Sequence, residues 1–444
     1  MELPRTDEAG TRLVSRAVRV DAPSPRTVLR AATSPRTLWA APEEATVVAG
    51  GAAATLTADG PDRFATVREG VESLLSVGNV HAGTEAAQPR LFGGFAFHDE
   101  GTERPPWTAF PGARFVLPRV QVTYADSGAW LTINAAGPDA TADAVEARLD
   151  RERDRIGSLV EDPPADPPGI VARERTTARD EWRTSVGEAV ERIRAGDLKK
   201  VVLAQALATT LDRPLSVPDV LERLGARYPD CYRFLVEPGD AAPSFFGATP
   251  ERLVTRRGRT VHTGALAGTT GRGDTPEEDE WLAAELLDDE KNVHEHELVA
   301  EAIREQLAPF ADSVRSGERG VRRLATVQHL WTPIDATLSE DAHVLDLVEA
   351  LHPTPAVGGL PPAEALSTIR ETEPFDRGWY AAPVGWVDAA GDGSFSVAIR
   401  SAVGDGRRAT LFAGVGVVAD SDPDREWDEV QLKYRPILDE LERR

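Results

Sequence analysis

Long amphipathic stretches and short strand-like stretches follow one another along this chain without a fixed order, and this mixture limits the possible folds most strongly. Residues 277–310 and 423–443 have the apolar spacing of helices, as does the stretch that ends near Gly196. Apolar runs that predict strands lie elsewhere, at 91–97, 114–125, 129–136, 232–237, 394–400 and 409–418. Long helices mixed with hairpin-like strands indicate an α+β fold with mostly antiparallel sheets, rather than a doubly wound parallel sheet.

The charge and composition of the chain exclude several classes of function. Nucleic acids and anionic membranes need an excess of positive charge on the contacting face, so a formal net charge of −23 predicts neither partner. A small anionic substrate is compatible with this charge if cations gather locally around it. Cys231 is the only cysteine, which excludes an intrachain disulfide and a cysteine metal cluster. The absence of a signal-peptide core and of any long apolar run predicts a cytoplasmic protein.

Lysine is rare in this chain, and two of its lysines are adjacent. Of the 50 lysines and arginines, only Lys199, Lys200, Lys291 and Lys433 are lysines. The first two precede the predicted strand VVLAQALATTL, where alternation places Lys200 on one face and Lys199 on the other. A partly buried ammonium can lose its proton whereas a guanidinium stays protonated, so a retained lysine is a candidate general base.

Two acidic helices carry carboxylates at positions that point to a metal site. Helical spacing in KNVHEHELVAEAIREQL places Glu295 on the buried side, where an unpaired carboxylate is costly. Glu426, Glu429 and Lys433 share one face of the last helix, downstream of a strand with glycines at 414 and 416. Glu295 and Glu429 predict a Mg²⁺ site completed by substrate oxygens, although a solvated Glu to Lys pair also fits the last helix. The HEHE sequence lacks the spacing of a zinc helix.

A third carboxylate lies at a turn. Pro and Gly residues on either side of Glu251 in FFGATPERLV indicate that its side chain faces a cleft or lies on a surface hairpin. The glycines of HTGALAGTTGRG, at 264, 268, 271 and 273, fit either a flexible connection or a backbone cradle for an anion. Neither stretch is a P-loop. The paired prolines of EDPPADPPG (161–169) predict an extended surface segment.

Taken together, these stretches resemble the chorismate-utilising enzymes, a family that includes isochorismate, salicylate, anthranilate and aminodeoxychorismate synthases. Ten motifs occur in the family's order over roughly 175–440, with weaker similarity toward the N-terminus. They are KVVLAQ (200–205), FGATPERL (246–253), TGALAGT (263–269), EHELV (295–299), VQHL (327–330), LHPTPAVGGLP (351–361), RGWYAAPVGW (377–386), AIRSA (398–402), GVGVVADSDPDREWDE (414–429) and LKYRP (432–436).

The resemblance implies one chorismate-binding domain over residues 1–444, with a strand-rich portion at 1–170 and a catalytic core at 175–440. It implies Lys200 as the base that activates water and Glu251 as the acid that protonates the departing hydroxyl. Glu295 and Glu429 would bind Mg²⁺ with Glu426 close by. The residues that would hold the substrate carboxylates are Thr269, Tyr380, Arg400 and Lys433, with the backbone of Gly414 and Gly416.

The nucleophile divides the members of this family. Ammonia-using members resemble one another in having glutamine at the position of Lys200, and aminodeoxychorismate enzymes have a lysine at the position of Ala267. This chain therefore looks like a water-using member, an isomerase that interconverts chorismate and isochorismate, and a monomer serving menaquinone or siderophore synthesis. The alternatives are a salicylate synthase, an anthranilate or aminodeoxychorismate synthase component, and an inactive chorismate-binding protein.

Three positions depart from the family pattern. Gln205 stands where arginine is usual, Asn292 replaces an aspartate in the sequence before Glu295, and YAAP replaces YAGP at Ala382. Asn292 removes one acidic neighbour of the expected metal site.

Overall fold

The structure is a computed structural model that describes residues 12–76, 78–99, 104–138 and 140–443. Its strands follow the expected antiparallel arrangement, since β1 and β4 form the one parallel pair among the pairings of the described residues. The predicted α+β fold with mostly antiparallel sheets is confirmed.

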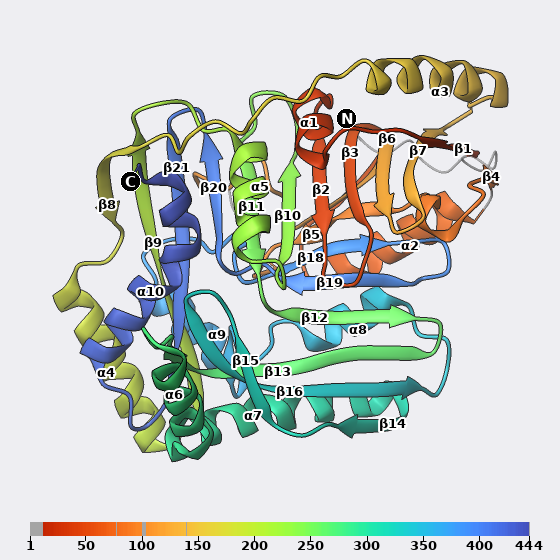
Figure 1. The fold of residues 1–444 in the computed structure, drawn as a ribbon. Coiled ribbons are helices and arrows are strands. Elements are labelled where there is room, and N and C mark those ends of the chain that lie inside the picture. The colour runs from red at the N-terminus through yellow and green to blue at the C-terminus, as the bar shows by residue number, and fades with distance from the viewer. Residues whose placement is uncertain (1–11, 77, 100–103, 139, 444) are drawn as a thin grey trace.

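The helices cover the outside of the sheets (Figure 1). They are α1 (Pro25–Ala31), α2 (Arg63–Leu75), α3 (Ala142–Gly157), α4 (Arg179–Ala195), α5 (Val217–Arg227), α6 (Pro276–Asp288), α7 (Glu290–Leu307), α8 (Val344–Leu351), α9 (Pro362–Thr372) and α10 (Pro423–Leu441), with 3-10 turns at Glu85–Ala87 and Ala308–Phe310.

The strands of the described residues come from the whole length of the chain. They are β1 (Leu13–Val20), β2 (Arg36–Ala40), β3 (Thr46–Ala58), β4 (Gly78–His81), β5 (Leu91–Phe95), β6 (Ala113–Ala125), β7 (Gly128–Ala136), β8 (Ile170–Arg175), β9 (Lys200–Leu211), β10 (Tyr232–Glu237), β11 (Ser244–Thr249), β12 (Arg252–Arg257), β13 (Thr260–Gly271), β14 (Ala311–Ser316), β15 (Gly320–Arg323), β16 (Val327–Leu338), β17 (Gly359–Leu360), β18 (Pro383–Val387), β19 (Gly393–Val397), β20 (Ser401–Asp405) and β21 (Arg408–Val417).

Strand β6 joins two runs of paired strands. One run continues from β6 through β3, β2, β10, β11, β20, β21 and β9 to β8. The other leaves the opposite edge of β6 through β5, β18, β19, β12 and β13 to β16. In Figure 1 strands β12, β13 and β16 run horizontally, whereas β9 and β21 run vertically.

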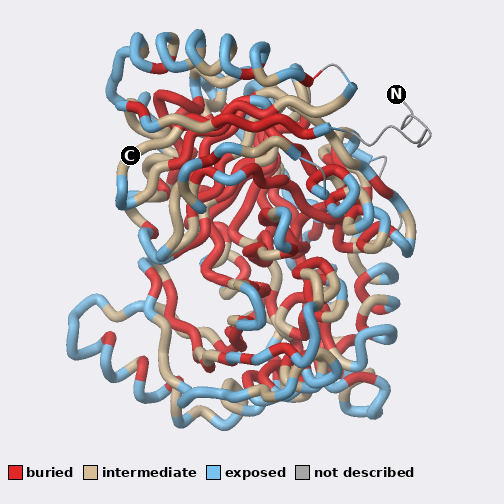
Figure 2. The backbone as a smooth tube through the Cα atoms, turned by 90° about the vertical axis from the view of Figure 1, so that its right-hand side faces the viewer, coloured by how far each residue is buried: buried red, intermediate tan, exposed pale blue. Residues whose placement is uncertain are grey.

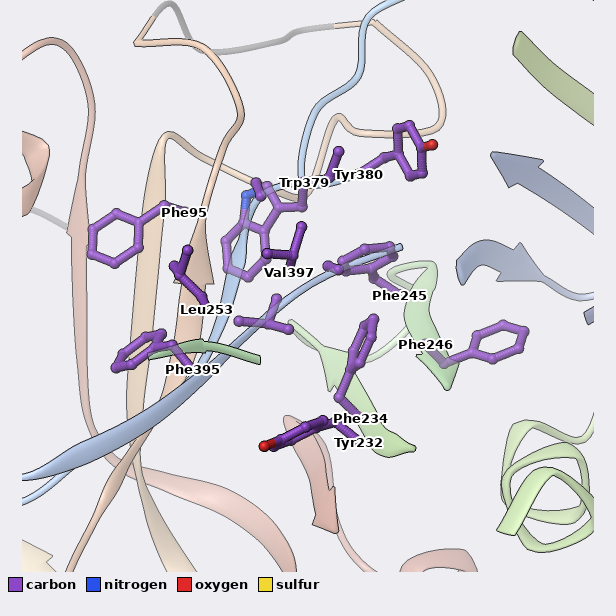
Figure 3. Close-up of a cluster of buried hydrophobic side chains, with 14 of the residues drawn as sticks. Phe95, Tyr232, Phe234, Phe245, Phe246, Leu253, Trp379, Tyr380, Phe395 and Val397 are labelled. Atoms are coloured by element: carbon purple, nitrogen blue, oxygen red, sulfur yellow. The ribbon is translucent and has the colours of Figure 1, made fainter. Parts of the chain in front are cut away.

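Aromatic side chains fill the space between the strands of both runs. Figure 3 shows Phe234 and Phe245 of the first run in one cluster with Phe395 of the second, whereas Phe246 lies farther from Phe395, and the Phe234 and Phe245 rings are 5.1 Å apart. Trp379 points into this cluster, whereas Tyr380, the next residue, turns away from it and stacks on Phe412. Figure 2 shows the buried residues concentrated in the inner strands and the exposed ones along the outlying helices. The core therefore supports the strands from which the site is built.

The helix boundaries follow the sequence signals closely. The α4 helix ends at Gly196, whose φ of 91° is easily reached only by glycine. The stretch 277–310 forms two helices, because Asp289 ends α6 and its side chain accepts from the Asn292 N–H to begin α7. The Asp422 carboxylate caps α10, with Pro423 in the first turn, and this cap fixes the start of the helix that carries Glu426 and Glu429.

The proline-rich segment 161–169 has no regular secondary structure, as predicted, but arginines hold it to the fold. Arg223 donates to the Ala165 carbonyl at 2.7 Å, and Arg213 donates to the Pro167 carbonyl at 3.0 Å. Among the described residues, no helix is long and apolar enough to cross a membrane.

Candidate active site

One cavity brings together ten of the eleven residues that the sequence singles out, and it lies where β9, β13, β21, α7 and α10 meet. Its lining includes Lys200, Glu251, Thr269, Glu295, Tyr380, Arg400, Gly414, Gly416, Glu429 and Lys433. Glu426 does not line it, but the charge of Glu429 acts on its carboxyl group. The cavity is the candidate active site.

Lys200 and Glu295 form a buried ion pair on one wall of the cavity. The Lys200 Nζ lies 2.8 Å from a Glu295 carboxylate oxygen, and the lysine side chain is 1% exposed. Burial alone would raise the pKa of Glu295, but the neighbouring lysines, Lys200 first among them, hold it below its usual value. The strand alternation is as predicted, because Lys199 is exposed on the other side of the chain.

Gly416 makes room for this ion pair. A Cβ atom at this position would clash with the Glu295 carboxylate and would lie 2.8 Å from Lys200 Cε. Gly416 is paired with Val202 in the β9–β21 ladder. Because Lys200 and Val202 point to the same face of β9, a side chain at position 416 would point to the face on which Lys200 lies. The glycine is therefore needed for side-chain space, since its backbone conformation is an ordinary strand.

We expect Gly416→Ala to lower turnover of the substrate by about 100-fold, because a displacement of reacting groups by about 1 Å has that effect. The added methyl group would push the side chains of Lys200 and Glu295 away from β21. Gly187→Ala is the matched control, since a Cβ there meets nothing within 4 Å on a helix. Steady-state rates of the two variants test this account, and a fully active Gly416→Ala variant would contradict it.

Three of the four lysines pair with the three glutamates expected at the metal site. Besides the pair formed by Lys200, Lys433 lies 2.7 Å from Glu429 and also donates to the Gly414 carbonyl at 2.9 Å. Lys291 lies 3.0 Å from Glu426 and so connects α7 to α10. Burial and the charge of Glu429 raise the pKa of Glu426, which Lys291 counteracts. The site is thus a compact set of compensated charges.

Glu251 is buried, so the alternative of a surface hairpin carboxylate is wrong. It lies between β11 and β12 and is 5% exposed. Burial raises its pKa to about 7, even though Lys200, Lys433 and Arg400 act in the opposite direction. A carboxyl group with a pKa near neutrality can both hold and release a proton at physiological pH, as an acid catalyst must.

Arg400, His329 and Thr269 form a buried chain of polar contacts. The Arg400 guanidinium lies 3.4 Å from His329 Nε2, and His329 Nδ1 lies 3.0 Å from the Thr269 hydroxyl. Burial lowers the pKa of His329 well below its usual value, so the ring is neutral. Because the Arg400 guanidinium can only donate, Nε2 accepts and the Nδ1–H donates to Thr269. Within the described part of the chain, Arg400 Nη1 has no hydrogen-bond partner. A buried, unpartnered guanidinium nitrogen is suited to binding an anionic group.

Asn292 supports this arrangement from behind. Its side-chain oxygen accepts from the Thr269 N–H at 3.3 Å, next to a register shift at Gly268, whose φ is 75°. The Asn292 oxygen therefore serves β13 at the bulge beside Thr269, and its amide nitrogen donates to Asp289 at 2.7 Å, which an aspartate could not do. Of the four glycines in HTGALAGTTGRG (262–273), only Gly268 lines the cavity, and Gly264 lies under the Trp331 ring. The stretch is a strand with a bulge, not a flexible connection.

Two functional candidates were missed from the sequence. His329 lies in the VQHL motif and lines the cavity, but a single histidine on a strand gives no signal of its own. Lys291 could have been identified, because it is one of only four lysines in the chain. Of the two histidines of HEHE, His294 is exposed, and His296 is buried with its Nε2 2.8 Å from the Thr332 hydroxyl.

Among the described residues, no three His, Cys, Asp or Glu side chains are arranged to hold a metal ion by themselves. A pair of carboxylates is enough for Mg²⁺, which commonly takes one or two protein carboxylates and completes its shell with water and substrate oxygens. Glu295 and Glu429 both line the cavity and supply hard oxygen donors. This pair does not fit a structural zinc site, which needs four protein ligands.

The chain belongs to the chorismate-binding enzymes, because the family described as chorismate binding enzyme matches residues 3–442. The isochorismate synthase MenF of Bacillus subtilis is 38% identical over 361 residues, covering 80% of this chain and 75% of that protein. The salicylate biosynthesis isochorismate synthase of Pseudomonas aeruginosa is 40% identical over 411 residues, covering 92% of this chain and 85% of that protein. The structure of MenF from Escherichia coli matches with a TM-score of 0.82 at 25% identity, covering 98% of this chain and 95% of that one.

Proposed function

We propose that this protein is a Mg²⁺-dependent isochorismate synthase that adds water at one ring carbon of chorismate while a hydroxyl group leaves another. The observation that carries the proposal is the cavity that combines Lys200 with Glu251, a buried carboxyl group whose pKa is about 7. Water addition with loss of hydroxyl needs a base and an acid in one site, and these two groups can serve. The identities to two isochorismate synthases support the same reaction.

Lys200 acts as the base that takes a proton from water. The ammonium form that pairs with Glu295 has three N–H donors and no lone pair, so Lys200 must first give up a proton before it can accept one from water. Glu251 acts as the acid and gives its proton to the departing hydroxyl. Because reversal of the reaction exchanges these roles, a carboxyl pKa near 7 suits both directions.

Cations that gather in the cavity hold the anionic substrate, although the chain as a whole is acidic. The unpartnered Arg400 Nη1 and the Lys433 ammonium are the charged donors of the cavity that we assign to the substrate. Thr269, Tyr380 and the backbone of Gly414 and Gly416 supply the remaining contacts. Glu295 and Glu429 would hold Mg²⁺, with Glu426 behind them, and the ion would neutralise a substrate carboxylate that would otherwise be repelled.

Water, rather than ammonia, is the nucleophile in this proposal. Lys200 takes the place of the glutamine of ammonia-using relatives, and Ala267, which lines the cavity, has no amine to form a covalent intermediate. The proposal of a single chorismate-binding domain over residues 1–444 is supported by strands from before the proline-rich segment that pair with strands after it, as β2 does with β10.

The test is product analysis after incubation of the protein with chorismate, with Mg²⁺ and with a chelator. We expect isochorismate as the product with Mg²⁺ and no turnover with the chelator. Salicylate with pyruvate would instead identify a salicylate synthase, and an aminated product formed with ammonia would identify an amine-transferring enzyme. An unchanged substrate in the presence of Mg²⁺ would indicate a binding protein without activity.

A further inference from the structure

The edge of strand β9 next to Lys200 has a gap in its strand partners. On this edge β17 pairs with Lys200 and Val201, and β8 pairs from Leu207 onward. Between these two neighbours the strand continues to present backbone groups that no strand reaches. Such groups need partners when they are buried, and Val202 and Ala204 are 5% and 3% exposed.

Two charged side chains fill this gap. The Arg377 guanidinium donates to the Val202 carbonyl at 2.8 Å, and the Glu373 carboxylate accepts from the Ala204 N–H at 2.8 Å. The two side chains also hold each other in a two-bonded fork of 2.8 and 2.5 Å. They are 1% and 4% exposed, so water does not compete for these bonds. The pair thus substitutes for a short strand beside the segment that begins with Lys200.

The same guanidinium contacts a second element of the site. Arg377 Nη1 donates to the Val357 carbonyl at 2.7 Å, and Val357 in turn donates its N–H to the Thr354 carbonyl at 3.0 Å. The buried hydroxyl group of Thr354 makes no hydrogen bond to a described residue, but it lies near enough to Glu251 to lower the pKa of that carboxyl group against the effect of burial. One side chain therefore connects the strand of the candidate base to the loop beside the candidate acid.

Arg377 lines the cavity, but its donors are already used, in contrast to those of Arg400. Its Nε, Nη1 and Nη2 all donate to the protein, and Glu373 neutralises its charge. Arg400 keeps Nη1 without a partner among the described residues. The substrate is thus expected to meet Arg400, whereas Arg377 acts on the backbone.

We propose that Glu373 and Arg377 are positioning residues that fix Lys200 relative to Glu251. The inference rests on the proposed function, because it assigns the pair an effect on the two groups that carry that reaction. Its physical basis is that backbone bonds at Val202 and Ala204 limit how far the start of β9 can shift. Small displacements of reacting groups have large effects on rate.

The test is the Glu373→Gln variant, whose amide keeps one oxygen acceptor but turns its nitrogen toward an Arg377 N–H, so that the fork loses one of its two bonds and its negative charge. We expect kcat to fall about 100-fold while KM for chorismate changes less than about 3-fold, because geometry and not binding is altered. The pH dependence of kcat should also move, since the environments of Lys200 and Glu251 shift relative to each other. A purely structural role would leave this profile unchanged.

The matched control is Glu237→Gln, which removes one bond from a similar fork with Arg36, at 2.7 and 2.6 Å, outside the lining of the cavity. Both variants should lose similar thermal stability, and only Glu373→Gln should lose kcat. Arg377→Lys is the second variant, since lysine keeps the charge but cannot bridge both carbonyls, and the same loss of kcat is expected.

Three results would overturn the inference. They are a Glu373→Gln variant with the kcat and pH profile of the unmodified protein, an equal loss of kcat in Glu237→Gln, and a rise in KM alone, which would place Arg377 on the substrate. An unmodified protein that leaves chorismate unchanged with Mg²⁺ would reject the proposed function itself, which separates the two failures.

Discussion

Replacing Lys200 by alanine is expected to lower kcat by about 100-fold to 10,000-fold, the usual contribution of a general base. The variant removes the amine that we propose as the base, which lies 2.8 Å from Glu295. Product formation from chorismate under saturating Mg²⁺ measures the effect. Circular dichroism would establish that the fold persists.

Two controls separate the role of the base from that of its charge. Lys200→Arg keeps a cation beside Glu295, and therefore most of the ion pair, but a guanidinium cannot accept a proton near neutral pH. We expect it to be folded and as inactive as the alanine variant. Lys199→Ala changes the exposed neighbour and should retain full activity. Near-normal turnover in Lys200→Ala would contradict the assignment of the base.

Replacing Glu251 by glutamine is expected to lower kcat by about 100-fold to 10,000-fold, because an amide has the shape of a carboxyl group but no transferable proton. In the unmodified protein, the direction that needs Glu251 as acid should slow as pH rises through about 7, where burial has placed the pKa. Rates measured at several pH values in that direction test this. A rate that stays constant above pH 7 would show that another group supplies the proton.

The same substitution should change how stability depends on pH. The pKa of Glu251 is raised from 4.5 to about 7 on folding, so between these values the folded protein binds a proton that the unfolded chain has lost. Stability therefore falls as pH rises through this window, since the charged carboxylate must be buried. Glu251→Gln is free of this loss. Its melting temperature relative to the unmodified protein should increase from pH 5 to pH 8, and a constant difference would contradict the burial effect.

Periodicity alone predicted to which side of its strand or helix each of several side chains points. Alternation in the strand separated Lys200 from Lys199, and helical spacing placed Glu295 on the inner side of α7. Turn residues marked the position of Glu251, although not that it is buried. These signals are local, because each depends only on neighbours within a few positions in the chain.

What the sequence could not predict are contacts set by strand register over long distances. The pairing of Thr269 with His329 follows from how β13 aligns with β16, including the shift at Gly268. The sequence predicts a backbone contact for Gly416, and the structure adds that this glycine also makes room for the Lys200 and Glu295 side chains. The role of Glu373 depends on a gap between β17 and β8, which no pattern within α9 or the following loop reveals.

Incubation of the protein with chorismate and Mg²⁺ in water enriched in ¹⁸O tests the central claim most directly. A base that activates solvent water predicts isochorismate with one heavy oxygen at the newly hydroxylated ring carbon, and no pyruvate. Isochorismate that carries no heavy oxygen, or salicylate with pyruvate as the main products, would contradict the proposed reaction.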